Sequence, residues 1–409
     1  MTGRLRIAIV GCGTAGAASA LFLSRAGHDV VLLERVAEPL PVGAGIMMQP
    51  SGLLVLERLG LVDRVLARGS RVDHLVCETT EGRSVLDLRY DALGEGLYGV
   101  GLHRGVLFET LFGALGKSDA RIVCGAEIDR VRTLRSGDVA LVLASGETYG
   151  PFDLVVLCDG ARSRIRDAMP ALTKTVKPYP WGALWFIGHD RDDRHASRLH
   201  QIVRGARHMI GLLPTGLGPG HGDVPLVSLF ASVRADAIDA VRARGIQAWK
   251  QHVRELAPIA ERVLDQIHDF AQLTFASYWD VTMPRWHSHR VVLLGDAAHA
   301  TSPQLGQGCN LALCDAAALA DALSAAGSID EALDRYTASR RAHLAYYQLA
   351  TRWLTPFFQS DMDWLGALRD VAMGPASRLG FVRREMVRSM AGTKTGLLFG
   401  SMETRMARK

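Results

Sequence analysis

An uncharged, largely apolar run fills the chain from Ile7 to Ser24, within the stretch RIAIVGCGTAGAASALFLSRAG (6–27). A run of this length is long enough to span a membrane, and the nearby Arg4 and Arg6 resemble the basic start of a signal peptide. Its interior argues otherwise, because β-branched residues come first and three glycines follow where a spanning helix would carry leucines. The pattern therefore predicts a buried strand, a tight turn and a helix.

Three further apolar runs have the pattern of buried parallel strands. Each is rich in Val and Leu and ends in an acidic residue: DVVLLE (29–34), DLVVLCD (153–159) and VVLLGD (291–296). Continuous apolar runs of this kind are typical of strands that helices cover on both faces. Together with the opening segment they predict an α/β fold with a Rossmann-like sheet.

Between about 176 and 288 this pattern gives way to alternating stretches such as WGALWFIG (181–188) and HMIGLLPTG (208–216). Alternation predicts an antiparallel sheet inserted into the α/β domain, with a smaller contribution from about 72–100. We expect this sheet to cover a ligand on the α/β domain. Most of its aromatic side chains are expected to form a packed core.

Residues 331–375 carry apolar side chains at helical spacing, and Pro356 interrupts them. This segment predicts helices that pack over the two domains. A role of the exposed part of this tail at a membrane surface or a protein partner stays open.

Composition and charge narrow the picture. Hydrophobic residues make up 48% of the 409 residues and charged residues 22%, as in an ordinary globular protein. The net charge is +5, and the basic residues are dispersed among 42 acidic ones. They form no basic motif for nucleic acid. Six scattered cysteines form no C-x-x-C pair and no metal-ligand spacing, which predicts a reduced, cytoplasmic protein without a metal site. Beyond the opening segment, the sequence has no other apolar run long enough to predict a membrane span.

The letters GCGTAG (11–16) give the spacing G-x-G-x-x-G between the predicted strand and helix. The first glycine permits a tight turn, Gly13 lets a pyrophosphate approach the backbone, and Gly16 allows close helix packing. Glu34 ends the second strand, where a carboxylate accepts hydrogen bonds from an adenosine ribose. These features predict dinucleotide binding and leave NAD and FAD both open.

Two later motifs decide for flavin. DLVVLCDGARSRIR (153–166) contains a D-G pair after a strand, and RVVLLGDAAHATSPQLGQGCN (290–310) contains a G-D pair followed by a Pro- and Gly-containing loop. In this order the three motifs resemble those of the class A flavoprotein monooxygenases, the p-hydroxybenzoate hydroxylase type. The resemblance covers almost the whole chain. A second nucleotide fingerprint is missing, so NADH or NADPH would visit only transiently.

The resemblance implies a set of residues around FAD. Asp296 would bind the ribityl chain, the backbone from Gly306 to Asn310 would face the flavin ring, and Arg104 would reach the phosphates. Asp159 and its following arginines would touch both FAD and the nicotinamide. The full set of expected FAD-binding positions is Gly11, Gly13, Ala15, Gly16, Glu34, Arg35, Gly45, Ile46, Arg104, Asp159, Asp296, Gly306, Gly308, Cys309 and Asn310.

The same motifs divide the chain into expected domains. An FAD-binding domain is expected from 1–71, 101–175 and 289–330, a substrate domain from 72–100 and 176–288, and a C-terminal helical segment from 331–409. The assembly is expected to be a monomer or a homodimer.

The implied function is hydroxylation of a small aromatic or heteroaromatic compound. NAD(P)H would reduce a tightly but non-covalently bound FAD, dioxygen would add at flavin C4a, and the hydroperoxide would transfer oxygen to the ring. Pro303, His208 and Gln49 are the candidate catalytic residues, His208 as a base and Pro303 through its carbonyl group. The candidate pocket residues are Met47, Trp185, Ile210 and Phe230.

Three other functions stay open. A flavin-dependent halogenase shares the fold, although its G-W-x-W-x-I-P signature is missing from this sequence. A flavin reductase or dehydrogenase would not insert oxygen. A flavin-binding redox sensor would have no turnover at all.

Overall fold

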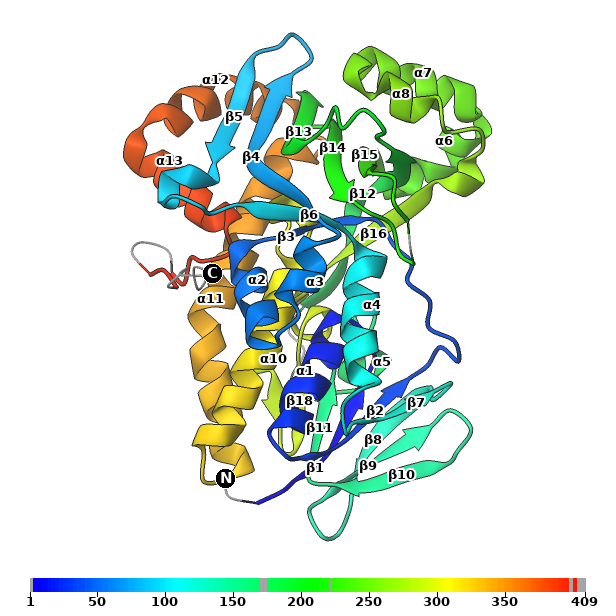
Figure 1. Cartoon of the computed structure of the whole chain (residues 1–409), viewed down its shortest axis with the longest axis vertical. Coiled ribbons are helices and arrows are strands. Elements are labelled where there is room, and N and C mark those ends of the chain that lie inside the picture. The colour runs from blue at the N-terminus through cyan, green and yellow to red at the C-terminus, as the bar shows by residue number, and fades with distance from the viewer. Residues whose placement is uncertain (1–2, 170–171, 173–174, 221, 397–399, 403–409) are drawn as a thin grey trace.

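The computed structural model describes residues 3–402 apart from 170–171, 173–174, 221 and 397–399. Figure 1 shows an α/β part at the bottom of the view and a part built on a large sheet at the top. Helix α11 (Ile329–Phe358) runs along one side and rises from the lower part to the upper one. At a rise of about 1.5 Å per residue, a helix of this length is about 45 Å long and can brace both parts.

The lower part contains a six-stranded sheet in the order β17-β18-β11-β1-β2-β7. Its strands are β17 (His287–Ser288), β18 (Val291–Leu293), β11 (Leu154–Leu157), β1 (Arg6–Val10), β2 (Asp29–Glu34) and β7 (Arg121–Cys124). All neighbouring pairs except β17–β18 are parallel. The three motifs and Glu34 therefore follow adjacent strands and meet at one edge of the sheet, as the sequence predicts.

Three helices pack around this sheet edge: α1 (Thr14–Arg25), α4 (Arg104–Leu115) and α10 (Gly308–Ala325). Shorter helices complete this region and the segments that connect it to the upper part. They are α2 (Pro50–Arg58), α3 (Val62–Leu66), α5 (Arg164–Asp167) and α9 (Asp296–His299). The predicted strand, turn and helix of the opening segment are thus confirmed as β1, the glycine turn and α1.

The upper part is a nine-stranded sheet in the order β16-β12-β15-β14-β13-β4-β6-β3, with β5 paired to β4. The strands from the inserted region are β12 (Thr175–His189), β13 (Ser197–Arg204), β14 (His208–Gly216), β15 (Leu226–Arg234) and β16 (Thr274–Thr282). Those from the first hundred or so residues are β3 (Gly45–Met48), β4 (Ser70–Thr79), β5 (Ser84–Arg89) and β6 (Gly99–His103). The sheet is antiparallel except at the β13–β4 junction, which is parallel.

Helices cover both faces of this sheet. Residues of α7 (Ile246–Leu256) and α8 (Glu261–Leu264) pack with Ile210 and Leu212 in one cluster, and α6 (Ile238–Ala243) lies beside them. On the opposite face, Phe358 of α11 and Met373 of α12 (Asp363–Arg378) pack with Met209 and Phe230. Helix α13 (Gly380–Met390) follows α12.

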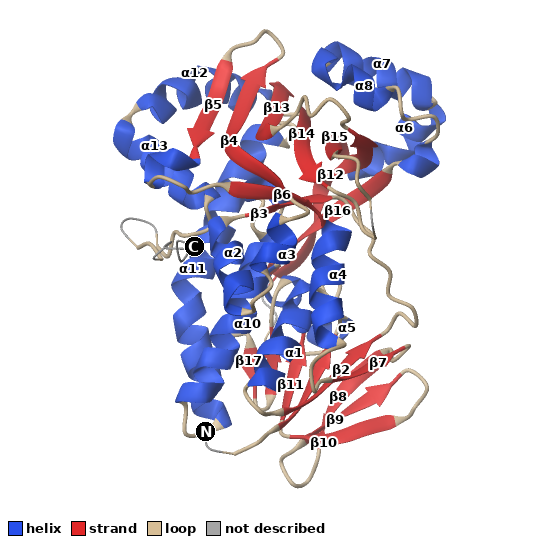
Figure 2. Cartoon of the chain, in the orientation of Figure 1, coloured by secondary structure: helices blue, strands red, loops and turns tan. Residues whose placement is uncertain are grey.

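Two features differ from the sequence-based prediction. Figure 2 shows a small separate sheet at the lower edge, formed by β8 (Ile128–Thr133), β9 (Val139–Leu143) and β10 (Thr148–Phe152), which the motifs did not indicate. Pro356 does not interrupt α11 midway, because it falls in the last turn of a helix that ends at Phe358. Within the described residues, no helix is long and apolar enough to cross a membrane.

Candidate active site

The glycine turn between β1 and α1 leaves one glycine facing open space. A Cβ at Gly11, whose φ is +96°, would lie 2.6 Å from the Cys158 carbonyl oxygen, and one at Gly16 would lie 1.9 Å from the Gly11 carbonyl oxygen. Both glycines therefore allow close packing within the protein. A Cβ at Gly13 would meet no atom of the described residues within 4 Å. The start of α1 is thus open to a ligand, as a pyrophosphate requires.

Glu34 lies beside this turn at the end of β2. Its Oε2 accepts a hydrogen bond from the Cys12 backbone N–H at 2.7 Å, and its Oε1 accepts one from the Val36 N–H at 3.0 Å. These bonds fix the carboxylate at the strand end, where a Rossmann-like fold presents an acid to a ribose. Arg35 follows as an exposed side chain.

Asp159 lies after β11, the strand between β1 and β18. Its Oδ1 is buried without a hydrogen-bond partner among the described residues, and burial raises the pKa of this carboxyl group. A ligand hydroxyl or N–H would satisfy this oxygen. Arg166, one of the arginines expected to touch FAD and the nicotinamide, is buried instead. Its guanidinium contacts the Ala297 carbonyl oxygen at 3.2 Å and also Asp167. It therefore connects the two motifs instead of facing a ligand.

Asp296 begins α9 and is exposed. Its Oδ1 lies 4.0 Å from where a Cβ of Gly308 would stand, at the first turn of α10. A Cβ on the preceding Gly295 would lie 3.0 Å from the Ala15 Cβ, so the G-D pair packs directly on the start of α1. The side chain of Gln307, the N-cap residue of α10, makes no capping hydrogen bond to the helix. The Asp296 carboxylate and the first N–H groups of α10 therefore border the same open space.

Pro303 lies in the loop that leads into α10. It is exposed, and its carbonyl oxygen accepts a hydrogen bond from the Gly306 N–H at 2.8 Å. Gly306 has a φ of +61°, a conformation that favours glycine. A Cβ at Gly306 would lie 3.6 Å from the Cβ of Met47. The loop that follows the G-D motif therefore contacts β3 of the large sheet.

The Asn310 side chain clamps this junction. It is fully buried, and its Nδ2 donates to the carbonyl oxygens of Met47 at 3.0 Å and Gly306 at 3.1 Å. Its Oδ1 accepts from the Gln49 N–H at 2.9 Å. The Asn310 side chain thus holds protein backbone, which leaves the backbone of this turn to face a ligand.

Cys309 precedes this clamp, and its Sγ packs 3.8 Å from the Met47 carbonyl oxygen. Burial raises the pKa of the thiol to about 12, with the Arg104 guanidinium acting in the opposite direction. A protonated, packed thiol is a poor nucleophile. Arg104 itself begins α4 with an exposed side chain, which lies against the backbone of Gly43.

Strand β3 carries the remaining residues expected beside the flavin. Gly45 packs against β15, since a Cβ there would lie 2.3 Å from the Ser228 Oγ. Ile46 is half-buried. After β3, Gln49 is buried, and its Oε1 accepts a hydrogen bond from the Tyr90 hydroxyl. Burial raises the pKa of Tyr90 above its ordinary value, so this hydroxyl keeps its proton. Sequence reasoning did not identify Tyr90.

Three aromatic residues of the large sheet, Trp185, Phe230 and Tyr278, lie on the face toward α11 and α12. The rings of Trp185 and Phe230 lie 4.9 Å apart between centroids, and the Trp185 Nε1 donates to the Tyr278 hydroxyl at 3.3 Å. A Cβ at Gly211 would lie 2.0 Å from the Phe230 ring, so this glycine makes room for the ring. Met47 packs against Leu213, whose side chain lies on this same face of β14.

Two predicted substrate-site residues lie on the other face of this sheet. Ile210 packs with residues of α7 and α8, because side chains alternate along β14 and Ile210 follows the inward-facing Met209. His208 is on the same outer side, with its ring 5.1 Å from that of His252 in α7. Neither residue joins the candidate site, and the assignment of His208 as a base is corrected.

A buried ionic network supports the G-D segment and was missed from the sequence. Asp315 of α10 is fully buried, and its Oδ2 accepts from the Gly295 N–H at 2.9 Å and lies 2.5 Å from His299 Nε2. Its Oδ1 accepts from Arg340 of α11 at 2.7 Å. Burial alone would raise the pKa of Asp315, but His299 and Arg340 lower it to about 2. The ionised Asp315 thus fixes the backbone just before Asp296.

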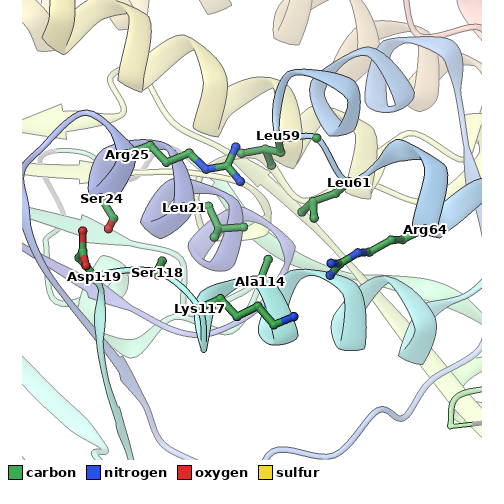
Figure 3. A pocket seen from close by; sticks show the side chains of 11 residues that line it. Leu21, Ser24, Arg25, Leu59, Leu61, Arg64, Ala114, Lys117, Ser118 and Asp119 are labelled. Atoms are coloured by element: carbon green, nitrogen blue, oxygen red, sulfur yellow. The ribbon is translucent and has the colours of Figure 1, made fainter. Parts of the chain in front are cut away.

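A separate pocket of about 370 Å³ lies at the far end of α1. Figure 3 shows Leu21 and Arg25 at the end of α1, with Leu59, Arg64 and Lys117 around the opening. The glycine turn is at the other end of this helix, and the nearest lining residue, Leu21, is about two helical turns from Gly13, so the pocket takes no part in the candidate site. Among the described residues, no cluster of side chains could hold a metal ion.

Comparisons with known proteins identify the family of this chain. A family model described as the FAD binding domain matches residues 4–348. The chain is 31% identical over 384 residues to 3-amino-4-hydroxybenzoate 2-monooxygenase of Streptomyces cremeus, with 87% of this chain and 88% of that protein covered. It is 27% identical over 345 residues to 6-hydroxynicotinate 3-monooxygenase of Pseudomonas fluorescens, with 79% and 83% covered.

Solved structures show the same fold. The crystal structure of P. aeruginosa PqsL in complex with 2-aminobenzoylacetate matches with a TM-score of 0.77 at 22% identity, covering 90% of this chain and 100% of that chain. The family match spans most of the sequence. The chain therefore belongs to the FAD binding domain family, as a FAD-dependent aromatic monooxygenase of the class A type.

Proposed function

We propose that this protein uses NADH or NADPH and dioxygen to hydroxylate a small, fairly apolar aromatic or heteroaromatic compound. The observation that carries the proposal is the contact between Gly306 and Met47, where a Cβ on the glycine would stand 3.6 Å from the Met47 Cβ. Through this contact the open edge of the α/β sheet borders Met47, which packs with Leu213 on the face of β14 where Gly211 makes room for the Phe230 ring. A redox cofactor and an aromatic ring would meet at such a border.

The residues of the open edge fit FAD. Gly13 and the first turn of α1 would bind the pyrophosphate, Glu34 the adenosine ribose, and Asp296 the ribityl hydroxyl groups. The unpaired Oδ1 of Asp159 would accept a further hydrogen bond from this cofactor. When bound, FAD would supply electron transfer from the nicotinamide and activation of dioxygen. The first N–H groups of α10 would stabilise negative charge on the reduced ring.

On the substrate side, apolar residues would exclude water and one amide would orient the ring. Met47, Trp185 and Phe230 offer apolar surface, which protects a reactive site from hydrolysis. The Tyr90 hydroxyl donates to Gln49 Oε1, so the Gln49 NH₂ group is the part left to donate to a substrate oxygen. Gln49 would thus be a substrate-positioning residue. With His208 on the outer face of the sheet, the proposal includes no histidine base.

The names of the relatives support the substrate class. The two curated relatives described above act on a hydroxybenzoate and on a hydroxynicotinate, both of which are small aromatic rings that carry a hydroxyl group. Both compounds also carry a carboxylate, so their names support an aromatic ring with a hydroxyl group and say nothing for an apolar substrate.

The test is turnover with a panel of phenols, pyridines and quinolones. We expect at least one compound to accelerate NADH or NADPH consumption together with oxygen uptake, and to yield a product heavier by one oxygen atom. Peroxide is measured in the same assay. Nicotinamide oxidation that yields only peroxide with every compound would contradict the hydroxylase function and favour a flavin reductase or oxidase.

A further inference from the structure

Helix α12 buries one side, which carries Leu365, two glycines and one arginine. Gly366, Arg369 and Gly374 are buried against the protein. A Cβ at Gly366 would lie 2.6 Å from the Ala206 backbone N, and one at Gly374 would lie 2.6 Å from the Ser84 carbonyl oxygen. The Arg369 guanidinium contacts the Gly205 and Phe357 carbonyl oxygens at 3.0 and 2.8 Å. The helix thus packs closely on the protein through this face, and the buried Leu365 and the partly buried Met373 supply its apolar contacts.

The opposite side of α12 is apolar and exposed. Trp364 is 64% exposed, Leu368 48% and Val371 65%, and their spacing places them on one side of the helix. Leu379, 61% exposed, follows the last residue of α12, and Phe381, 67% exposed, lies in the first turn of α13. We call these five residues the α12 apolar face. A helix that only covered a core would bury such residues, so an exposed apolar face of this kind indicates an interaction surface.

Within the part of the chain that the structure describes, the charged side chains of α12 and α13 that have no ion-pair partner are all arginines. Arg378 ends α12, and Arg383 and Arg384 follow in α13. Across the described ranges, none of these three arginines takes part in an ion pair. The acidic side chains of the same helices are already paired: Asp363 with Arg207 at 3.1 Å, Asp370 with Arg369 at 2.6 Å, and Glu385 with Arg388 and Lys394.

We propose that the α12 apolar face docks on an anionic membrane surface. Trp364 and Phe381 would sit at headgroup level with the aliphatic residues, and the three arginines would bind anionic headgroups. A second copy of this chain fits less well, because a twofold contact through this face would bring two sets of unpaired arginines together. The helix would lie flat on the surface, in keeping with its length and its one-sided apolar face.

Vesicle sedimentation with the FAD-loaded full chain tests this proposal. We expect binding to vesicles of phosphatidylcholine mixed with phosphatidylglycerol, weaker binding to phosphatidylcholine alone, and loss of the difference at high salt. The double substitution Trp364→Ser and Leu368→Ser should lower the partition coefficient about tenfold or more. Arg383→Gln and Arg384→Gln should each lower it about fivefold on the anionic vesicles only.

Matched controls separate docking from misfolding. Leu40 and Val42 are 67% and 70% exposed but lie in the loop between β2 and β3, so Leu40→Ser and Val42→Ser should leave vesicle binding unchanged. The α12 variants replace outward-facing side chains and should keep the bound flavin spectrum and the unfolding midpoint of the wild type.

Three results would overturn the proposal. The wild type could stay in the supernatant with both kinds of vesicle, or the double variant could bind as the wild type does. Light scattering could also show a dimer that the double variant converts to a monomer without any vesicle binding by the wild type. That last result would assign the face to a second copy of the chain.

Discussion

The backbone N–H of Gln49 donates to the side chain of Asn310 at 2.9 Å, across 261 residues of sequence. This bond joins the first turn of α10, which follows the G-D motif, to the residue that follows β3. The candidate cofactor site and the candidate substrate site therefore share one buried side chain. A change at Asn310 should disturb both.

Asn310→Ala should weaken FAD retention and lower the free energy of unfolding. The substitution leaves the Gln49 N–H and the Met47 carbonyl oxygen without their buried partner, at a cost of about 1–3 kcal/mol for each such group. Equilibrium dialysis of FAD and urea unfolding measure the two effects. Cys309→Ala is the control, because its thiol makes only weak contacts and its loss should change both quantities little. Equal FAD affinity in Asn310→Ala and Cys309→Ala would show that the hydrogen bonds of the Asn310 side chain do not support the cofactor site.

Asp315→Asn should destabilise the protein far more than Asp321→Asn. Both acids lie on α10, but Asp315 is fully buried between His299 and Arg340, whereas Asp321 pairs with Arg58 at the surface. Breaking a buried ion pair costs about 3–5 kcal/mol, and an exposed pair contributes about 1 kcal/mol or less. Urea unfolding of the two variants tests this difference. Similar losses in the two would show that the buried network does not support the G-D turn.

Stability should fall as the pH is lowered from neutrality, in part because of His343. Burial and the nearby Arg340 lower the pKa of His343 to about 3. An unfolded histidine protonates near about pH 6.5, so between these values the unfolded chain binds more protons and each pH unit costs up to about 1.4 kcal/mol. His343→Gln should unfold more easily at neutral pH, but its stability should depend less steeply on pH. An unchanged slope in the variant would contradict this assignment.

Gly13→Val and Gly16→Val should fail in different ways. A side chain at Gly13 meets no described atom within 4 Å, so this variant should fold and remain in solution without flavin. A Cβ at Gly16 would stand 1.9 Å from the Gly11 carbonyl oxygen, so that variant should be unstable even when FAD is added. Absorbance of bound flavin and circular dichroism distinguish the two. A yellow Gly13→Val protein would mean that no phosphate approaches this turn.

The sequence was sufficient to predict the parts whose pattern is local. The strands around Ile9, Leu32 and Val292 are continuous apolar runs, and glycine spacing identified the turn at Gly13. Parallel strands place their carboxyl ends at one edge, so the position of Glu34 and Asp296 at the same edge of the sheet also followed from local patterns.

What the sequence could not predict depends on contacts between distant segments. Ile210 and His208 were candidate site residues, but they lie on the face of the sheet that packs against α7, and alternation gives two faces without saying which one meets the ligand. The pairing of Tyr90 with Gln49 and of Asp315 with Arg340 needed the fold itself. One signal was present for Asp315, since a charged residue inside the apolar run LALCDAAALA (311–320) indicates a buried partner.

The most direct test of the central claim is turnover of an accepted aromatic substrate under isotopically labelled dioxygen, with purified FAD-loaded protein and NADH or NADPH. The account predicts a hydroxylated product in which the added oxygen carries the label, and loss of that product when Asp296→Ala removes the flavin. A product whose added oxygen comes from water, or nicotinamide oxidation that leaves every aromatic compound unchanged, would contradict it.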